Sequence, residues 1–243
     1  MKSIIIAEIG SNWEGDVSKG IELIQQCKLI GADVVKFQMW RASDLYEKNH
    51  PLWNFIKKSE LTFTVAEKFK KIADSIGIEF MCSAFYPEAV TFLEKLGVSR
   101  YKVASRTCLM SDPFSFETLV EKSKTKKPVI ISMGMGGDIN KIKNIFNENL
   151  ITFCYCKSEY PLDFSKISWN EAIKYNGFSD HTLGSLAPLL FSILKKQSGS
   201  DQIIIEKHVK LPDSAGPDAE TSMDINDFKN LINQIRIIEQ LDL

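Results

Sequence analysis

The chain has no long apolar segment. Its first apolar run, residues 4–7, is too short for a signal peptide, and no stretch approaches the roughly 18 apolar residues of a membrane span. Neither sign of charge dominates, because 30 basic residues face 31 acidic ones and the formal net charge is −1. This balance argues against nucleic acid or an anionic membrane as a bulk partner. We therefore expect a cytoplasmic protein without nucleic-acid or membrane partners.

The five cysteines form no regular framework, and their number is odd. This pattern predicts reduced thiols in a cytoplasmic protein rather than disulfides. Cys154 and Cys156 are two residues apart in a strand-like run, so they share one face. We interpret both as small apolar fillers.

Histidine is also scarce, since the chain has only three. Two of them lie in similar settings: His181 follows the apolar run 175–178, and His208 follows the apolar run 203–205. If these runs are neighbouring parallel strands, both imidazoles emerge at the same end of the sheet. This arrangement predicts a site for a divalent metal. The alternative is a pair of hydrogen-bonded or acid–base histidines.

Apolar segments of strand length alternate with segments of helical periodicity throughout the chain. Eight such units in 243 residues predict a single (β/α)₈ TIM barrel over residues 1–243, with a doubly wound open sheet as the second possibility. The expected strands are 3–9, 32–38, 78–82, 100–104, 128–132, 151–156, 177–179 and 202–207. The expected helices are 17–30, 62–75, 87–96, 113–123, 139–147, 164–174, 183–196 and 225–241.

The chemistry of a TIM barrel lies at the carboxyl ends of its strands. Three charged residues lie near these ends in otherwise apolar strands: Glu8, Lys36 and Lys102. Buried charges need partners, so structural salt bridges are one explanation. The two lysines have no obvious local acidic partner, which favours a bound phosphate or carboxylate.

Further polar residues at the strand ends complete this anion site. Ser105, Ser132 and Ser179 add hydroxyl donors. A glycine-rich turn, residues 132–137, precedes an expected helix, so its amides can approach an anion closely. Near the predicted metal, Glu8 can act on a metal-bound water, and Asp180 or Glu206 can orient the imidazoles.

Together, these residues resemble the sialic acid synthases, a family that includes the legionaminic, pseudaminic and spore-coat polysaccharide enzymes. The resemblance covers essentially the whole chain, and its motifs occur in the order known for the family. They are residues 7–12, 31–38, 101–105, 128–135, 158–161, 179–184, 206–208 and 216–218.

The resemblance implies a transferase on a (β/α)₈ barrel that condenses phosphoenolpyruvate with an amino sugar aldehyde to give a nonulosonic or related 3-deoxy-2-keto sugar acid. It implies a divalent cation, expected to be Mn²⁺ with Mg²⁺ or Co²⁺ as alternatives, held by His181 and His208. Glu8 would lie by the metal and its water. The residues implied to bind the substrates are Lys36, Gln38, Lys102, Ser105, Ser132 and Ser179 for phosphoenolpyruvate, and Tyr160 and Asp218 for the sugar.

Three features depart from the family pattern. Family members usually continue into a small antifreeze-like domain that covers the sugar site of a dimer partner, whereas the resemblance of this chain covers the barrel domain only. We therefore expect a homodimer, or a separate protein that supplies the cap. After the Lys102 strand, the usual Ser-Gly-Glu or Ser-Gly-Asp is replaced by Ser105, Arg106 and Thr107, and the usual Asn-His of the first loop by Asn12 and Trp13.

The alternative functions are a non-catalytic or partner-dependent subunit of a sugar-acid pathway, or another metal-dependent aldolase or isomerase.

Overall fold

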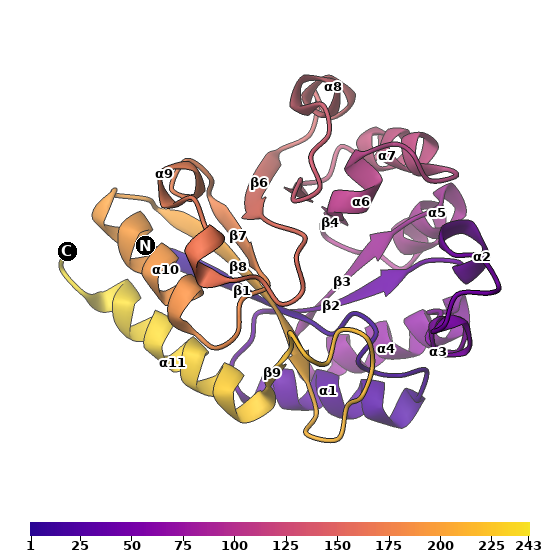
Figure 1. Cartoon of the computed structure of the whole chain (residues 1–243), viewed down its shortest axis with the longest axis horizontal. Helices are drawn as coiled ribbons and strands as arrows, with labels where there is room; N and C mark the ends of the chain where they lie inside the picture. Colours follow the sequence, from indigo (N-terminus) through magenta and orange to yellow (C-terminus); the bar gives the residue numbers. More distant parts are fainter.

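A computed structural model describes residues 1–243. Eight parallel strands form a closed barrel, because β1 pairs with β2 on one side and with β8 on the other. The predicted TIM barrel is therefore confirmed. In Figure 1 the indigo β1 lies beside the orange β8, where the two ends of the sheet meet. The strands are β1 (Lys2–Glu8), β2 (Val34–Met39), β3 (Glu79–Ala84), β4 (Tyr101–Val103), β5 (Val129–Ser132), β6 (Ile151–Cys156), β7 (Gly177–Asp180) and β8 (Gln202–Lys210).

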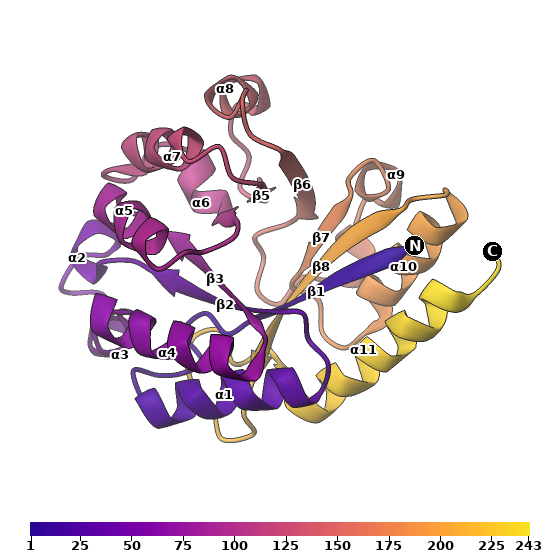
Figure 2. The ribbon, with the colours of Figure 1, turned by 180° about the vertical axis from the view of Figure 1, so that it is seen from behind.

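Helices surround the barrel, and the views from both sides show them following one another around it in chain order (Figures 1 and 2). Short helices α2 (Ala42–Leu45), α3 (Trp53–Lys58), α6 (Ser105–Cys108) and α9 (Trp169–Ala172) lie within loops. The longer helices are α1 (Val17–Leu29), α4 (Phe63–Ile76), α5 (Pro87–Lys95), α7 (Ser115–Lys124), α8 (Ile139–Ile145), α10 (Leu186–Gln197) and α11 (Ile225–Gln240).

Alternation of side chains along each strand gives the barrel two apolar layers. Six side chains from six strands fill its interior: Ile6, Val34, Met81, Ile130, Cys154 and Ile204. The residues between them point outward into a cluster of 50 buried apolar residues beneath the helices. The interior is thus closed by side chains below the mouth, so only the residues at the carboxyl ends of the strands can meet a ligand.

The sequence predictions differ from the structure mainly in short elements. The predicted helix 164–174 is a 3₁₀ turn at Phe164–Lys166 followed by α9, and the two-residue strand β9 (Met223–Asp224) extends the sheet beside β8. Four-residue helices such as α6 are too short to show a helical period in sequence.

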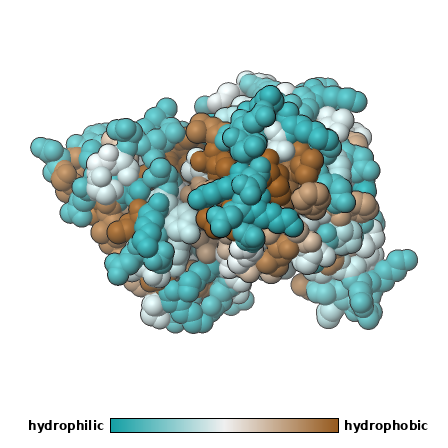
Figure 3. All heavy atoms as spheres, turned by 90° about the horizontal axis from the view of Figure 1, so that it is seen from above, coloured by the Kyte–Doolittle hydropathy of each residue, from teal (hydrophilic) through white to brown (hydrophobic).

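No helix is both long and apolar enough to cross a membrane. Seen from the α8 side, apolar atoms gather near the middle of the surface, with polar side chains beside and between them (Figure 3). All five cysteines are free thiols.

Close packing of α1 on α4 depends on Gly20. A Cβ atom at this position would lie 2.2 Å from Cζ of Phe69. We expect Gly20→Ala to lower the free energy of unfolding by about 1–2 kcal/mol, because overpacking outweighs the better helix propensity of alanine. Urea denaturation measures this, with Gln25→Ala at an exposed position of α1 as the control. An unchanged or increased stability of Gly20→Ala would contradict the packing argument.

Candidate active site

A cavity of about 400 Å³ opens at the carboxyl ends of the strands. The structure brings every predicted site residue to this one cavity, although their roles stay predictions. These residues are Glu8, Lys36, Gln38, Lys102, Ser105, Ser132, Tyr160, Ser179, His181, His208 and Asp218. They come from six of the eight strands and from the loops that follow the strands.

Both lysines have acidic partners, as the salt-bridge explanation expects, and these partners are distant in the sequence. Lys36 Nζ lies 2.8 Å from Oε2 of Glu8, and Glu206 lies 3.5 Å from the Nζ atoms of both Lys36 and Lys102. All four side chains are almost fully buried. Glu206 is far from either lysine in the sequence, and closure of the barrel places it between them. The lysines thus lie in a compact cluster of two cations and two carboxylates.

The two carboxylates of this cluster differ in acidity. Burial raises the pKa of Glu8 to about 6, and the attraction of Lys36 only partly offsets this effect. Burial would also raise the pKa of Glu206, but Lys102 and Lys36 outweigh it and lower that pKa to about 2. Glu206 is therefore the permanent counter-charge of the two lysines, whereas Glu8 is the group that can take up a proton near neutral pH.

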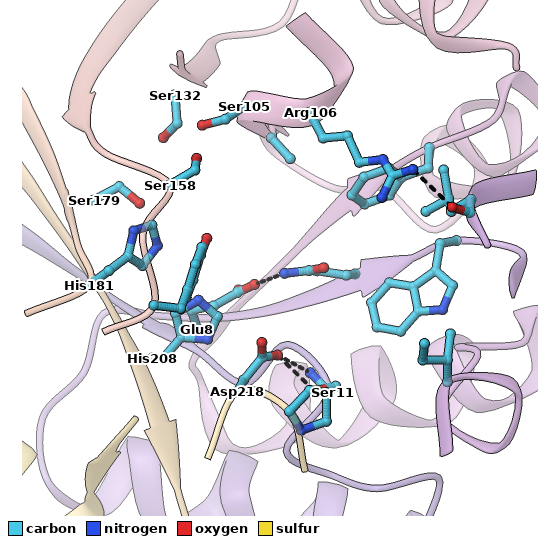
Figure 4. A pocket seen from close by; sticks show the side chains of 18 of the residues that line it. Glu8, Ser11, Ser105, Arg106, Ser132, Ser158, Ser179, His181, His208 and Asp218 are labelled. Atoms are coloured by element: carbon cyan, nitrogen blue, oxygen red, sulfur yellow. Dashed lines mark hydrogen bonds between the residues drawn. The ribbon is translucent and has the colours of Figure 1, made fainter. Parts of the chain in front are cut away.

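Serine hydroxyls gather on one side of the cavity. Figure 4 shows Ser105, Ser132, Ser158 and Ser179 together on the side from which β5, β6 and β7 emerge. Lys102 Nζ donates to Ser132 Oγ at 2.7 Å, and Ser179 Oγ donates to Glu206 at 2.8 Å. A cluster of hydroxyls beside two ammonium groups can bind the oxygens of a phosphate or carboxylate.

The glycine-rich turn contributes differently from the prediction. A Cβ atom on Gly134 would lie 2.8 Å from Oγ of Ser158, so only glycine fits here. The amide of Gly134 donates to Ser105 Oγ at 2.8 Å and thereby orients that hydroxyl. Of this turn, only Ser132 and Met135 line the cavity, and no residue of α8 does. The prediction that this turn and helix offer their amides to an anion is therefore wrong.

His181 and His208 lie side by side, with ring centroids 5.6 Å apart. Nδ1 of His181 is 2.7 Å from the carbonyl oxygen of Lys157, which can only accept, so Nδ1 carries the proton and Nε2 keeps a free lone pair. Nδ1 of His208 is buried without any partner, and burial lowers the pKa of this imidazole. Two adjacent imidazoles can offer two nitrogen ligands to a divalent cation. No third side chain completes a metal-binding cluster.

Asp218, Glu8 and His208 converge around the backbone of Gly10. A Cβ atom there would lie 3.0 Å from Oδ2 of Asp218, 3.5 Å from Oε1 of Glu8 and 3.5 Å from Cε1 of His208. Ser11 holds Asp218 through its amide and its hydroxyl (Figure 4). The ring of Tyr160 lies 4.1 Å from that of His181, so this half-exposed tyrosine borders the histidine pair.

Asp180 does not orient an imidazole, contrary to the prediction. It lies 2.6 Å from Nζ of the buried Lys207 and accepts the amide of Thr182, so it fixes the turn after β7. Two of the residues that differ from the family pattern also lie away from the cavity. Trp13 is buried and packs edge-on against Phe69, and Thr107 is a buried residue of α6 that does not line the cavity. Only Arg106 lines the cavity.

Sequence reasoning missed several lining residues. Cys156 is not only a filler, because its Sγ reaches the cavity 4.0 Å from Nδ1 of His181, whereas Cys154 fills the barrel interior as predicted. Ser158 belongs to a recognised motif without an assigned role. The long, aromatic-rich segment 39–59 carried the one available signal, and three of its aromatic side chains, Trp40, Tyr46 and Phe55, line the cavity.

The chain is thus a TIM barrel whose mouth holds two buried lysines, several serine hydroxyls and two paired histidines in one cavity. The model of the NeuB family matches residues 23–242, so the chain belongs to the NeuB family and is a synthase. It is 33% identical to the N,N'-diacetyllegionaminic acid synthase of Legionella pneumophila, over 98% of this chain and 73% of that protein.

Two further proteins are similar to this chain. An uncharacterized protein of Methanocaldococcus jannaschii is 36% identical over 98% of this chain and 72% of its own length. The crystal structure of the N-acetylneuraminic acid synthetase of Leptospira borgpetersenii superposes with a TM-score of 0.86 at 24% identity, covering 99% of this chain and 85% of that one. At this identity the superposition supports the fold alone.

Proposed function

We propose that the protein condenses phosphoenolpyruvate with an amino sugar aldehyde to form a nonulosonic acid and inorganic phosphate. One observation carries the proposal: two buried lysines and four serine hydroxyls adjoin a pair of histidines in a single cavity. The first group suits an enol phosphate, and the second suits the carbonyl that it attacks. The relative from Legionella pneumophila is named as a synthase of an acid of this kind, which supports the proposal. We place this reaction in the cytoplasm.

His181 and His208 would hold the divalent cation, for which we expect Mn²⁺, with Mg²⁺ or Co²⁺ as alternatives. Bound there, the cation would polarise the carbonyl of the acceptor as a Lewis acid. Glu8 and Asp218 lie close to His208 and would bind the water molecules and substrate hydroxyl groups next to the cation. The carbonyl of Lys157 keeps His181 in the tautomer that offers Nε2.

The side chains of the anion site would orient phosphoenolpyruvate so that its C3 faces the aldehyde carbon. The C2=C3 π pair forms the new bond from C3 to that carbon, the carbonyl π pair moves onto the aldehyde oxygen as an alkoxide, and positive charge develops at C2. Water then adds at C2 and transfers its proton to Glu8, whose raised pKa suits it to act as a base near neutral pH. The C2–O bond to the phosphate breaks last, as the C2 hydroxyl becomes the ketone and its proton goes to the alkoxide formed from the aldehyde. Lys36, Lys102 and the serines stabilise the departing phosphate.

Phosphate release tests the proposal. The folded protein is incubated with phosphoenolpyruvate, Mn²⁺ and a panel of acylated amino sugars, and inorganic phosphate is measured. We expect sugar-dependent phosphate release from wild type and a loss of at least about 10³-fold in His181→Ala, together with weaker Mn²⁺ binding by calorimetry. His50→Ala, which changes the remaining histidine, is the control for metal binding. No phosphate release with any sugar in a metal-loaded preparation would refute the proposed reaction.

A further inference from the structure

The outer part of the cavity is lined mainly by apolar and aromatic side chains. They come from α2, α3 and the segments around these helices, with one more from the loop after β3: Trp40, Leu45, Tyr46, Leu52, Phe55 and Phe85. The wall is rigidly packed, since Trp40 and Phe85 contact each other edge-on and Phe55 covers the backbone of Gly216. Such surfaces stack on the C–H faces of sugars and on acyl methyl groups.

One basic side chain, Arg106, reaches this wall, but its charge is already matched. Its Nε and Nη2 atoms lie 2.6 and 2.8 Å from the two carboxylate oxygens of Asp112. Nη2 also donates to the carbonyl of Leu45 at 2.9 Å, and the guanidinium lies 5.2 Å from the ring centroid of Tyr46. Figure 4 shows Arg106 extending away from the serines. Arg106 thus ties α6 to the aromatic wall instead of offering a free cation.

The other ionisable groups near the wall add no positive charge. Nδ1 of His50 is occupied by the amide of Leu52, which it accepts at 3.2 Å. Asp218, at the inner border of this region, is a carboxylate held by Ser11. A phosphate or carboxylate on the far end of an acceptor would therefore lose water without gaining a cationic partner.

We propose that this region is the acceptor subsite and that it selects an uncharged, acylated sugar against its phosphorylated counterpart, with the Arg106–Asp112 pair as the specificity-determining element. The inference rests on the proposed function for the identity of the acceptor as an amino sugar. The bidentate contact of Arg106 with Asp112, and not the mere presence of an arginine, would then set the preference for the neutral over the phosphorylated sugar. Releasing Arg106 from Asp112 would create an anion receptor at the wall.

The test compares N-acetylmannosamine with N-acetylmannosamine 6-phosphate by calorimetric titration of the Mn²⁺-loaded protein. We expect wild type to bind the neutral sugar at least about tenfold more tightly, a difference that corresponds to about 1.4 kcal/mol. Asp112→Asn should reduce this ratio about tenfold by freeing the guanidinium. The control Asp74→Asn, which removes a surface partner of Lys70 on α4, should leave the ratio unchanged.

The comparison on wild type alone needs no variant to fold. Equal or tighter binding of the 6-phosphate by wild type, no binding of either sugar at millimolar concentration, or an unchanged ratio in Asp112→Asn would each overturn the inference. Binding is measured apart from turnover. A preference for the neutral sugar without phosphate release would therefore contradict the proposed reaction but support the acceptor subsite. Phosphate release with tighter binding of the 6-phosphate would support the proposed reaction but contradict the acceptor subsite.

Discussion

Replacing Lys102 with methionine should lower kcat/KM for phosphoenolpyruvate by about 10²–10³-fold, because one partner of a buried, hydrogen-bonded charge cluster is lost. Lys102 Nζ donates to Ser132 Oγ and lies 3.5 Å from Glu206. Methionine keeps the length and most of the packing of the side chain but offers no donor. The anion would then meet Glu206 with only one of its two compensating cations, so the loss should appear mainly as a higher KM.

Steady-state phosphate release over a range of phosphoenolpyruvate concentrations measures this loss. Lys127→Met is a matched control, because Lys127 precedes β5 at the opposite end of the barrel and pairs with Glu94 at 2.8 Å. It should leave KM for phosphoenolpyruvate within about twofold of wild type. Urea denaturation verifies that both variants are folded. A KM within about threefold of wild type for Lys102→Met would show that this lysine does not bind the anion.

The barrel was predictable because its evidence is local. Each strand is a short apolar run, each long helix has an amphipathic period, and the order of alternation leaves few topologies. Placing polar residues at the carboxyl ends of the strands then follows from parallel pairing. In this way Glu8, Lys36 and His208 could be assigned to one mouth before their distances were known.

Pairing within the mouth was not predictable in the same way. Glu206 meets Lys36 and Lys102 because closure of the barrel brings distant strands together, and no short sequence pattern records that contact. Asp180 was misassigned because it adjoins His181 in sequence, whereas neighbouring residues of a strand point to opposite faces. It therefore points outward to Lys207, not into the mouth.

The aromatic wall of the cavity was only partly predictable from the sequence. The length and aromatic content of segment 39–59 indicated a functional loop, but α2 and α3 are too short for a periodic signal. The role of Arg106 was hidden as well. As a departure from the family pattern it raised a question about the sugar site, and only its contacts with Asp112 and Leu45 show what the side chain does.

Lys122 is a buried amine outside the cavity, and it has no carboxylate partner. Its side chain is fully buried, and Nζ donates to the carbonyls of Ala84 and Lys102 at 2.9 and 3.0 Å. These carbonyls belong to neighbouring strands whose ladder has a single residue pair, Ser83 with Lys102. Lys122 therefore joins β3 to β4 where the sheet itself is weakest, directly behind a residue of the anion site.

Replacing Lys122 with methionine should lower the free energy of unfolding by about 2–6 kcal/mol at pH 9, because two buried carbonyls lose their donor at about 1–3 kcal/mol each. The effect should shrink at lower pH. Burial lowers the pKa of Lys122 to about 7, whereas an unfolded lysine titrates near 10.5, so the unfolded state binds more protons between these values. Wild-type stability from this group thus rises with pH above 7, by up to about 1.4 kcal/mol per unit.

Urea denaturation of wild type and Lys122→Met at pH 6.5 and pH 9 isolates this contribution, because the titrations of all other groups largely cancel in the difference. The control is Lys124→Met, an exposed position on the same helix whose lysine pairs with Glu121. It should change stability by less than about 0.5 kcal/mol at either pH. If Lys122→Met cost the same at both values, the amine would not titrate in this range, and its carbonyl contacts would be those of a permanent ammonium. If it cost nothing at pH 9, the ladder between β3 and β4 would not depend on Lys122.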